Sequence, residues 1–197
     1  MNSTTLFIIR HGQTDWNLAE KLQGHTDIPL NAQGIEQAQK VAQFLKKKQI
    51  SLASLYSSDL QRAHQTAHEI SKIFTVDIIL SADLREGHFG KAQGLTKKEY
   101  HDLYGPFDYQ VLPEEIEAEP RHQVIARVKK FLTLIAQKHK GQQIAVVTHG
   151  GAIRSLISHF GHNIEDLPAI TNVSVITLTW HADQEDIFIL ESIEKPL

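Results

Sequence analysis

Cysteine is absent from this sequence, and several other features are missing with it. Without cysteine the chain can form no disulfide bond, no thiolate metal site and no cysteine nucleophile. It also lacks any run of about 20 apolar residues, the length that a membrane-spanning helix requires. Residues 1–5 contain neither the basic segment nor the long apolar stretch that is typical of a signal peptide. These absences favour a cytoplasmic protein that has no membrane partner.

An excess of basic residues is lacking as well, since 20 lysines and arginines stand against 23 acidic residues and give a formal net charge of −3. The one basic run, Lys46-Lys47-Lys48, is better explained as the solvated end of a helix. Nucleic acid is therefore not an expected partner. The glycine patterns GxxxxGKS/T and GxGxxG are missing, as is the GxSxG elbow of a serine nucleophile. If the chain performs phosphoryl chemistry, histidine is the best available nucleophile.

Short apolar runs alternate with amphipathic helical patterns along the chain. The runs predict strands at about 6–10, 52–56, 76–80, 143–148, 173–180 and 187–193. The helical spacing of apolar residues predicts helices after Gly34, from Asp59 as N-cap to Ile73, and at about 96–103, 121–139 and 151–160. This alternation predicts an α/β fold, a three-layer α/β/α sandwich around a mostly parallel sheet. The last two strands would form an antiparallel hairpin at one edge.

The length of 197 residues, with 41% of them hydrophobic, fits one domain with a sizeable core. No repeat, low-complexity tract or linker divides the chain, so residues 1–197 are predicted to form a single domain. Residues 84–121 are its least regular part, because glycine and proline recur there.

Two histidines follow two of the predicted strands. Arg10 and His11 come directly after the first apolar run, and His149 follows the run near residue 147. In open parallel α/β sheets, binding sites form at the edge where the strands reach their carboxyl ends. The arginine beside the first histidine indicates an anionic substrate, because guanidinium matches phosphate geometry with paired hydrogen bonds.

Arg62 and Glu86 could belong to the same site. Arg62 lies one turn inside the helix after the second strand; alternatively, it pairs on the surface with Asp59, three residues earlier. Glu86 follows the third strand and could protonate a leaving alkoxide, since a carboxyl group beside a phosphate dianion tends to keep its proton. Alternatively, it is a solvated loop residue. Judged alone, each is better explained by the surface interpretation.

His11 is the candidate nucleophile. A neutral imidazole nitrogen can attack phosphorus and form a covalent phosphohistidine. Nearby arginines would lower the pKa of His11 and keep the ring neutral. The chain contains 12 histidines, so most must be structural or exposed. His64 and His68 lie four residues apart, as metal ligands can, but no HExxH pattern supports them, and no metal site is predicted.

Ordered blocks of residues along nearly the whole chain resemble the histidine phosphatase superfamily, which includes the cofactor-dependent phosphoglycerate mutases. The RHG tripeptide alone is a weak signal, whereas the ordered set is specific. The matching blocks are Arg10-His11-Gly12-Gln13-Thr14 with Trp16-Asn17, Gly24-x-x-Asp27-x-Pro29-Leu30-x-x-x-Gly34, Ser57-Ser58-Asp59-Leu60-x-Arg62-Ala63-x-x-Thr66-Ala67, Leu84-x-Glu86-x-x-x-Gly90-x-x-x-Gly94, Val147-Thr148-His149-Gly150-Gly151 and Asn172-Val173-Ser174-Val175.

The resemblance implies catalytic roles, and it reverses the surface interpretations of Arg62 and Glu86. His11 would be the phosphorylated nucleophile. Glu86 would protonate the leaving oxygen and then deprotonate the water that hydrolyses the phosphohistidine. The groups that would hold the phosphoryl oxygens without a metal ion are Arg10, Asn17, Arg62, His149 and the backbone N–H of Gly150.

The resemblance also implies which residues lie on the substrate side. These are Thr14, which would shape the loop rather than perform chemistry, Gln23, Gly24 and residues 87–120 as a cap segment. The expected partner is a small phosphorylated metabolite, and no cofactor is expected.

Phosphatase and mutase share such a pocket and differ in what accepts the phosphoryl group. The chain resembles the mutases at His88-Phe89-Gly90 and at Gly94-Leu95-Thr96-Lys97. The mutases, however, usually place an arginine after the acidic residue, where this chain has Gly87, and they carry an adjacent Arg-Arg pair that is missing here. We therefore predict a metal-independent phosphomonoesterase that works through phosphohistidine.

Two alternatives remain. The first is a cofactor-dependent phosphoglycerate mutase. The second is a non-catalytic module that binds a phosphorylated ligand, which would be expected to lack His11, Glu86 or His149, although all three are present.

Overall fold

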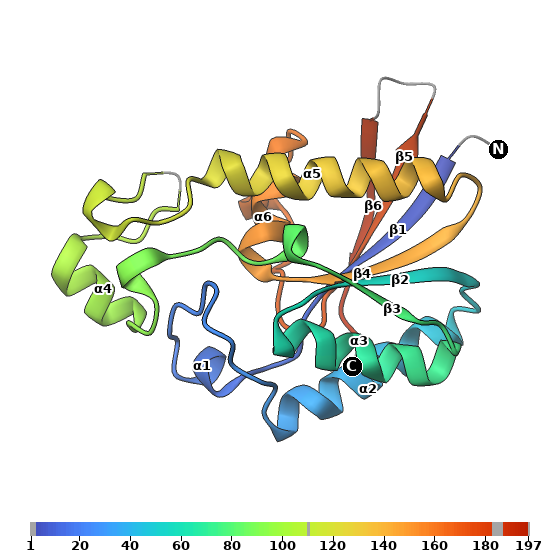
Figure 1. The fold of residues 1–197 in the computed structure, drawn as a ribbon, viewed down its shortest axis with the longest axis horizontal. Helices are drawn as coiled ribbons and strands as arrows, with labels where there is room; N and C mark the ends of the chain where they lie inside the picture. The colour runs from blue at the N-terminus through green and yellow to red at the C-terminus, as the bar shows by residue number, and fades with distance from the viewer. Residues whose placement is uncertain (1–2, 110, 183–186, 197) are drawn as a thin grey trace.

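The computed structural model describes residues 3–109, 111–182 and 187–196. Within these residues, the centre of the molecule is a six-stranded sheet with the order β3-β2-β4-β1-β5-β6 (Figure 1). β1 to β4 run parallel, whereas β5 is antiparallel to β1 and β6 is antiparallel to β5. The predicted mostly parallel sheet with an antiparallel hairpin at one edge is confirmed. The strands are β1 (Ser3–Arg10), β2 (Leu52–Ser58), β3 (Ile78–Ser81), β4 (Gln143–Thr148), β5 (Val175–His181) and β6 (Ile187–Glu194).

Helices cover both faces of the sheet and complete the three predicted layers (Figure 1). α2 (Ala32–Lys47) and α3 (Gln61–Phe74) pack on one face, and α5 (Arg121–Lys138) and α6 (Gly150–His159) pack on the other. The remaining elements are α1 (Asp15–Leu18), α4 (Lys97–Tyr104) and the 3-10 turns Ala82–Leu84, Gly90–Ala92, Glu114–Ile116 and Ile164–Asp166.

β1 shows why the sheet needs cover on both faces. Leu6 and Ile8 belong to the apolar cluster under α5 and α6, whereas Phe7 and Ile9 belong to the cluster under α2 and α3. Successive side chains of a strand point to opposite faces, so a strand buried on both sides has to be apolar throughout. This alternation fixes the register that brings the end of β1 beside the end of β4.

The predicted capping role of Asp59 is wrong. The N-cap position of α3 is Leu60, and Asp59 instead accepts two hydrogen bonds from the Arg85 guanidinium, at 2.7 and 2.5 Å. A paired, charge-assisted contact is stronger than one hydrogen bond to a backbone N–H. The cap comes from Asp27, whose carboxylate accepts from the Gln61 N–H at 2.7 Å. Asp59 is therefore not the partner of Arg62.

α1 lies inside the region that was expected to be irregular. Thr14 caps it in a reciprocal arrangement: its hydroxyl accepts from the Asn17 N–H at 3.1 Å, and the Asn17 side chain accepts from the Thr14 N–H at 3.2 Å. A single turn held by its cap carries too few residues for apolar periodicity to reveal it. β3 also differs from the prediction, because it begins at Ile78.

Residues of the 87–120 segment form a small apolar cluster of their own, with Phe89, Tyr100 and Ile116 buried. This segment is tied to the loop after β1, since the Leu22 N–H donates to the Leu95 carbonyl at 2.9 Å. Figure 1 shows α4 and its flanking turns extending past the end of the sheet where β4 finishes. In the described parts of the chain, no helix is both long and apolar enough to cross a membrane.

Candidate active site

The two histidines that were predicted to share a site lie side by side. β1 and β4 pair in parallel with Arg10 opposite Thr148, so His11 and His149 leave the sheet at the same edge. The His11 N–H donates to the Thr148 carbonyl at 3.0 Å, and the two ring centroids are 5.1 Å apart. Both side chains are buried.

The His11 ring is oriented by its own neighbour. Its Nδ1 lies 2.6 Å from the Gly12 carbonyl oxygen, which can only accept a hydrogen bond. In the neutral ring, Nδ1 therefore carries the proton, and Nε2 keeps its lone pair. Burial lowers the pKa of His11 well below its usual value, and the charges of Arg62 and Arg10 lower it further. The ring is thus neutral near pH 7, which a nucleophile requires.

His149 has both ring nitrogens engaged within the protein. Nδ1 accepts from Nε of Arg62 at 3.2 Å, so Nε2 carries the proton and lies 2.9 Å from the Ser58 hydroxyl. Its pKa is also held well below the usual value, by burial first and then by Arg62. Arg62 and His11 line one cavity at this edge of the sheet, whereas His149 is not among the residues that line it. In this arrangement His149 orients Arg62.

Acid should destabilise the protein because of these two rings. Below about pH 6.5 the unfolded chain protonates both histidines while the folded rings stay neutral. The free energy of unfolding should then fall by about 1.4 kcal/mol per pH unit for each ring until the folded pKa is reached. Urea unfolding at about pH 7 and about pH 5.5 measures this change.

The control for the acid effect is a histidine on the surface. Replacing His11 by asparagine should make the pH dependence of the free energy of unfolding weaker, and replacement of exposed His64 is the control. Equal slopes for the wild-type protein and the His11 variant would contradict the buried neutral ring.

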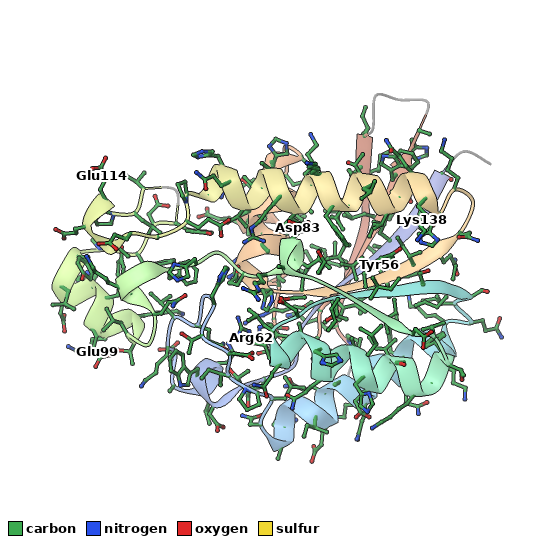
Figure 2. The ribbon with its side chains drawn as sticks, viewed as in Figure 1. Tyr56, Arg62, Asp83, Glu99, Glu114 and Lys138 are labelled. Carbon is green, nitrogen blue, oxygen red and sulfur yellow. The ribbon has the colours of Figure 1, made fainter. Side chains whose placement is uncertain are left out.

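Arg62 is completely buried at the start of α3 (Figure 2). Its Nη1 donates to the Thr26 carbonyl at 2.8 Å and its Nη2 to the Gly24 carbonyl at 2.7 Å. Burial lowers the pKa of Arg62 to about 10, so the group remains charged at neutral pH. A buried guanidinium without a carboxylate partner is costly, and an anion bound beside it would offset that cost.

Arg10 supplies a second guanidinium group to the site. Its Nη1 donates to the Ile170 carbonyl at 2.9 Å, while its buried Nε has no partner among the described residues. Burial, followed by the charge of Arg154, lowers the pKa of Arg10 to about 10. Arg10 and Arg62 together make the floor of the site positive.

Glu86, in the loop that follows the 3-10 turn Ala82–Leu84, directs its carboxylate to the beginning of α6. Its carboxylate accepts from the backbone N–H groups of Gly151 and Ala152, both at 2.8 Å, and of Gly87 at 3.1 Å. A Cβ at position 151 would lie 2.5 Å from Oε1 of Glu86, and one at position 150 would lie 3.0 Å from Nε of Arg10. The two glycines therefore allow the acid and the arginine to approach the helix end closely.

The loop after β1 brings in the remaining predicted residues. Asn17 lines the cavity, and its side-chain oxygen accepts from Asn172 at 3.3 Å, which leaves its amide nitrogen as the group that can donate to an anion. Gln23 and Gly24 also line the cavity. Thr14 does not: it is fully buried and donates to Gln23 at 3.1 Å, so its predicted place on the substrate side is wrong. Its hydroxyl is used within the protein, where it fixes Gln23.

These groups surround one cavity of about 680 Å³ at the carboxyl edge of the sheet. Among the described residues, no group of three His, Cys, Asp or Glu side chains is arranged to hold a metal ion. The residues predicted from sequence that line the cavity are Arg10, His11, Asn17, Gln23, Gly24, Arg62, Glu86 and Gly150.

Sequence reasoning missed one wall of this cavity, which α6 supplies. Gly151, Arg154, Ser155 and Ser158 all line it. The last three of these residues follow Gly151 by three, four and seven positions, and this spacing places all four on one face of a helix. A polar face at helical spacing directly after the His-Gly pair was the signal that could have revealed this wall. The cap segment contributes Phe107 and Tyr109, which no pattern in the sequence singled out.

Comparison with known proteins decides the family. Residues 6–191 match the model of the histidine phosphatase superfamily (branch 1). The chain belongs to this superfamily. Phosphoglycerate mutase-like protein 4 of Arabidopsis thaliana is 39% identical to this histidine phosphatase over 177 residues, which are 86% of this chain and 76% of that protein.

A metal-independent phosphoserine phosphatase of the same plant is 39% identical over 160 residues, covering 78% of this chain and 67% of that protein. Among solved structures, mycobacterial glucosyl-3-phosphoglycerate phosphatase with VO3 superposes with a TM-score of 0.82 at 29% identity, covering 95% of this chain and 97% of that one. The predicted family is confirmed, as is the predicted class of enzyme, a phosphoric monoester hydrolase. The roles of the individual site residues stay predictions.

Proposed function

We propose that this chain is a metal-independent phosphomonoesterase that hydrolyses a small phosphorylated metabolite through a phosphohistidine at His11. The observation that carries the proposal is the state of His11: a buried neutral ring whose Nε2 keeps its lone pair, in a cavity floored by Arg10 and Arg62. The names of two relatives, a metal-independent phosphoserine phosphatase and a glucosyl-3-phosphoglycerate phosphatase, support hydrolysis of such a substrate.

In the first step, Nε2 of His11 attacks phosphorus while the bond from phosphorus to the leaving oxygen breaks. Glu86 in its acid form gives its proton to that oxygen, and an alcohol leaves. Arg10, Arg62 and the amide group of Asn17 hold the other phosphoryl oxygens and stabilise their charge during transfer. The products of this step are phosphohistidine and the Glu86 carboxylate.

In the second step, the Glu86 carboxylate takes a proton from water as the water oxygen attacks phosphorus. The bond between phosphorus and Nε2 breaks, inorganic phosphate leaves, and both residues return to their starting forms. The backbone N–H groups of Gly151 and Ala152 hold the Glu86 carboxyl group at the cavity, so the same group is in place for the leaving oxygen and then for the water.

Phosphate release in the presence of a chelator is the test of this proposal. With EDTA present, the protein should hydrolyse p-nitrophenyl phosphate and at least one member of a phosphometabolite panel at undiminished rates. Short incubation with substrate followed by denaturation should leave acid-labile phosphate on the protein, since phosphohistidine is the intermediate. Inhibition by EDTA that a divalent metal ion reverses would overturn the mechanism.

The same assay separates the two alternatives. Rapid interconversion of 2- and 3-phosphoglycerate with little phosphate release would identify a mutase. Neither turnover nor labelling with any substrate would identify a binding module. Tyr109 weighs against the mutase, because its hydroxyl occupies the space that a side chain at position 87 would need. The arginine that the mutases usually place there has no room in this arrangement.

A further inference from the structure

Two of the six arginines in this chain belong neither to the phosphoryl site nor to an ion pair among the described residues. Arg10 and Arg62 form the floor of the cavity. Two others are neutralised by carboxylates: Arg85 pairs with Asp59, and Arg127 pairs with Glu119. The remaining arginines are Arg121 and Arg154, and in the described part of the chain neither forms an ion pair.

Both unpaired arginines line the same cavity as His11. Arg154 projects from α6 toward Arg10: Nη1 of Arg154 and Nε of Arg10 lie 3.2 and 3.0 Å from the point that a Cβ on Gly150 would occupy. Two guanidinium groups that converge on one point repel each other. This repulsion contributes to the lowered pKa of Arg10: burial is the largest cause of the shift, and the charge of Arg154 is the second. An anion bound between the two groups would relieve it.

Arg121, the first residue of α5, is held against the same wall. Its Nε donates to the hydroxyl of Ser155 at 3.2 Å, and Ser155 is buried in α6 directly after Arg154. This contact fixes the direction of the guanidinium and leaves its two terminal nitrogens as donors. Arg121 and Arg154 thus present charge from two different helices to one side of the cavity.

Two lysines that also line the cavity, Lys21 and Lys97, each contact another side chain. Lys97 lies 3.5 Å from a carboxylate oxygen of Glu20, and the ammonium of Lys21 lies 5.6 Å from the centre of the Trp16 ring. Beyond the phosphoryl site, the arginines that line the cavity without an ion pair among the described residues are therefore concentrated on the side of α5 and α6.

We propose that Arg121 and Arg154 form a second anion subsite, and that the substrate carries a second anionic group besides the phosphoryl group that is transferred. Carboxylate and phosphoryl groups share the chemistry that this subsite recognises, a planar or tetrahedral set of oxygens that accepts paired hydrogen bonds from guanidinium. Because Arg154 converges with Arg10, the two anionic groups are separated by a short carbon chain. The proposal rests on the proposed hydrolase activity.

Matched pairs of substrates test the subsite. O-Phosphoserine and O-phosphoethanolamine differ only in the carboxylate, and fructose 1,6-bisphosphate and fructose 6-phosphate differ in a second phosphoryl group. The wild-type protein should prefer the more acidic member of at least one pair by roughly 10- to 100-fold in kcat/KM, the range expected of charge-assisted hydrogen bonds. The pair that shows the preference identifies the group.

Charge-removing variants assign the preference to these residues. Arg121→Gln and Arg154→Gln should each lower the ratio within that pair by roughly 10-fold. Arg154 is exposed at the helix surface, so its variant should fold even if the Arg121 variant does not. Lys97→Gln is the matched control, since it removes a cation from the same cavity that is already paired, and it should keep the wild-type ratio.

A wild-type ratio near one in both pairs would overturn the subsite while leaving the hydrolase proposal intact, provided that phosphate is released. So would ratios that neither arginine variant changes. If the protein hydrolyses none of these esters, calorimetric binding of the same pairs to the wild-type protein separates the two proposals. A preference for the acidic member would then support the subsite and reject hydrolysis, whereas the absence of any preference would reject both.

Discussion

Replacing His11 by asparagine should lower phosphate release from every substrate by about 10⁴-fold or more, while the fold is retained. Asparagine can keep a polar contact with the Gly12 carbonyl but has no nucleophilic nitrogen. Loss of a covalent nucleophile costs this much because the residual rate comes only from binding and electrostatic stabilisation. The measurement is the initial rate with p-nitrophenyl phosphate, together with acid-labile labelling of the protein, which should disappear.

Circular dichroism and urea unfolding of the same variant provide the folding control. His64→Asn, on the exposed side of α3, should retain the wild-type rate. A rate for the His11 variant above about one hundredth of the wild-type rate, with labelling intact, would rule out His11 as the nucleophile. His149→Asn would then be the next variant to label, because its ring centroid lies 5.1 Å from that of His11.

Glu86→Gln should discriminate sharply between leaving groups. An alkoxide needs a proton in order to leave, whereas p-nitrophenolate leaves without one. We expect kcat/KM to fall by about 10²- to 10⁴-fold for an alkyl phosphate, the usual contribution of general acid catalysis, and by at least 10-fold less for p-nitrophenyl phosphate, an estimate of the same kind. The quantity kcat/KM reports formation of the phosphohistidine, so the later need for a base does not obscure this comparison.

Glu86→Gln should also remove the general base of the second step, and this loss should appear in a measurement of its own. With p-nitrophenyl phosphate, the Glu86 variant should release about one equivalent of nitrophenolate per site in a burst and then turn over slowly, because water is no longer deprotonated. Glu20→Gln is the control, since Glu20 also lines the cavity but is paired with Lys97. Equal losses of kcat/KM for alkyl and aryl esters, with no burst, would speak against an acid and base role for Glu86.

The sequence by itself determined the sheet and the centre of the site. Apolar runs of strand length alternate with helical patterns, and this is enough to predict a mostly parallel sheet, although the order of its strands came from the structure. Since the carboxyl ends of parallel strands share an edge, Arg10, His11 and His149 were expected at one edge, and the pairing of β1 with β4 brings them together there. The recurrence of ordered motifs then identified the family, because the distances along the chain between these residues are set by the elements that carry them.

Only the tertiary structure decided which partner each side chain has. Asp59 was close enough in sequence to pair with Arg62, but it pairs with Arg85, which lies 26 residues away. Thr14 belonged to a matching motif, yet its hydroxyl is directed inward to Gln23. These choices depend on side-chain direction and on competition among donors, which local spacing does not encode.

Local spacing along the chain also does not predict which residues line the substrate side of the cavity. The cap segment carries no strong periodicity, so the position of the Tyr109 hydroxyl beside Gly87 could not be predicted from the sequence. Arg121 and Arg154 come from helices separated in sequence, and they share a wall only because α5 and α6 pack on the same face of the sheet. The reacting centre follows from motifs at strand ends, which are local. Specificity depends on long-range packing, and packing is resolved only when the whole chain has folded.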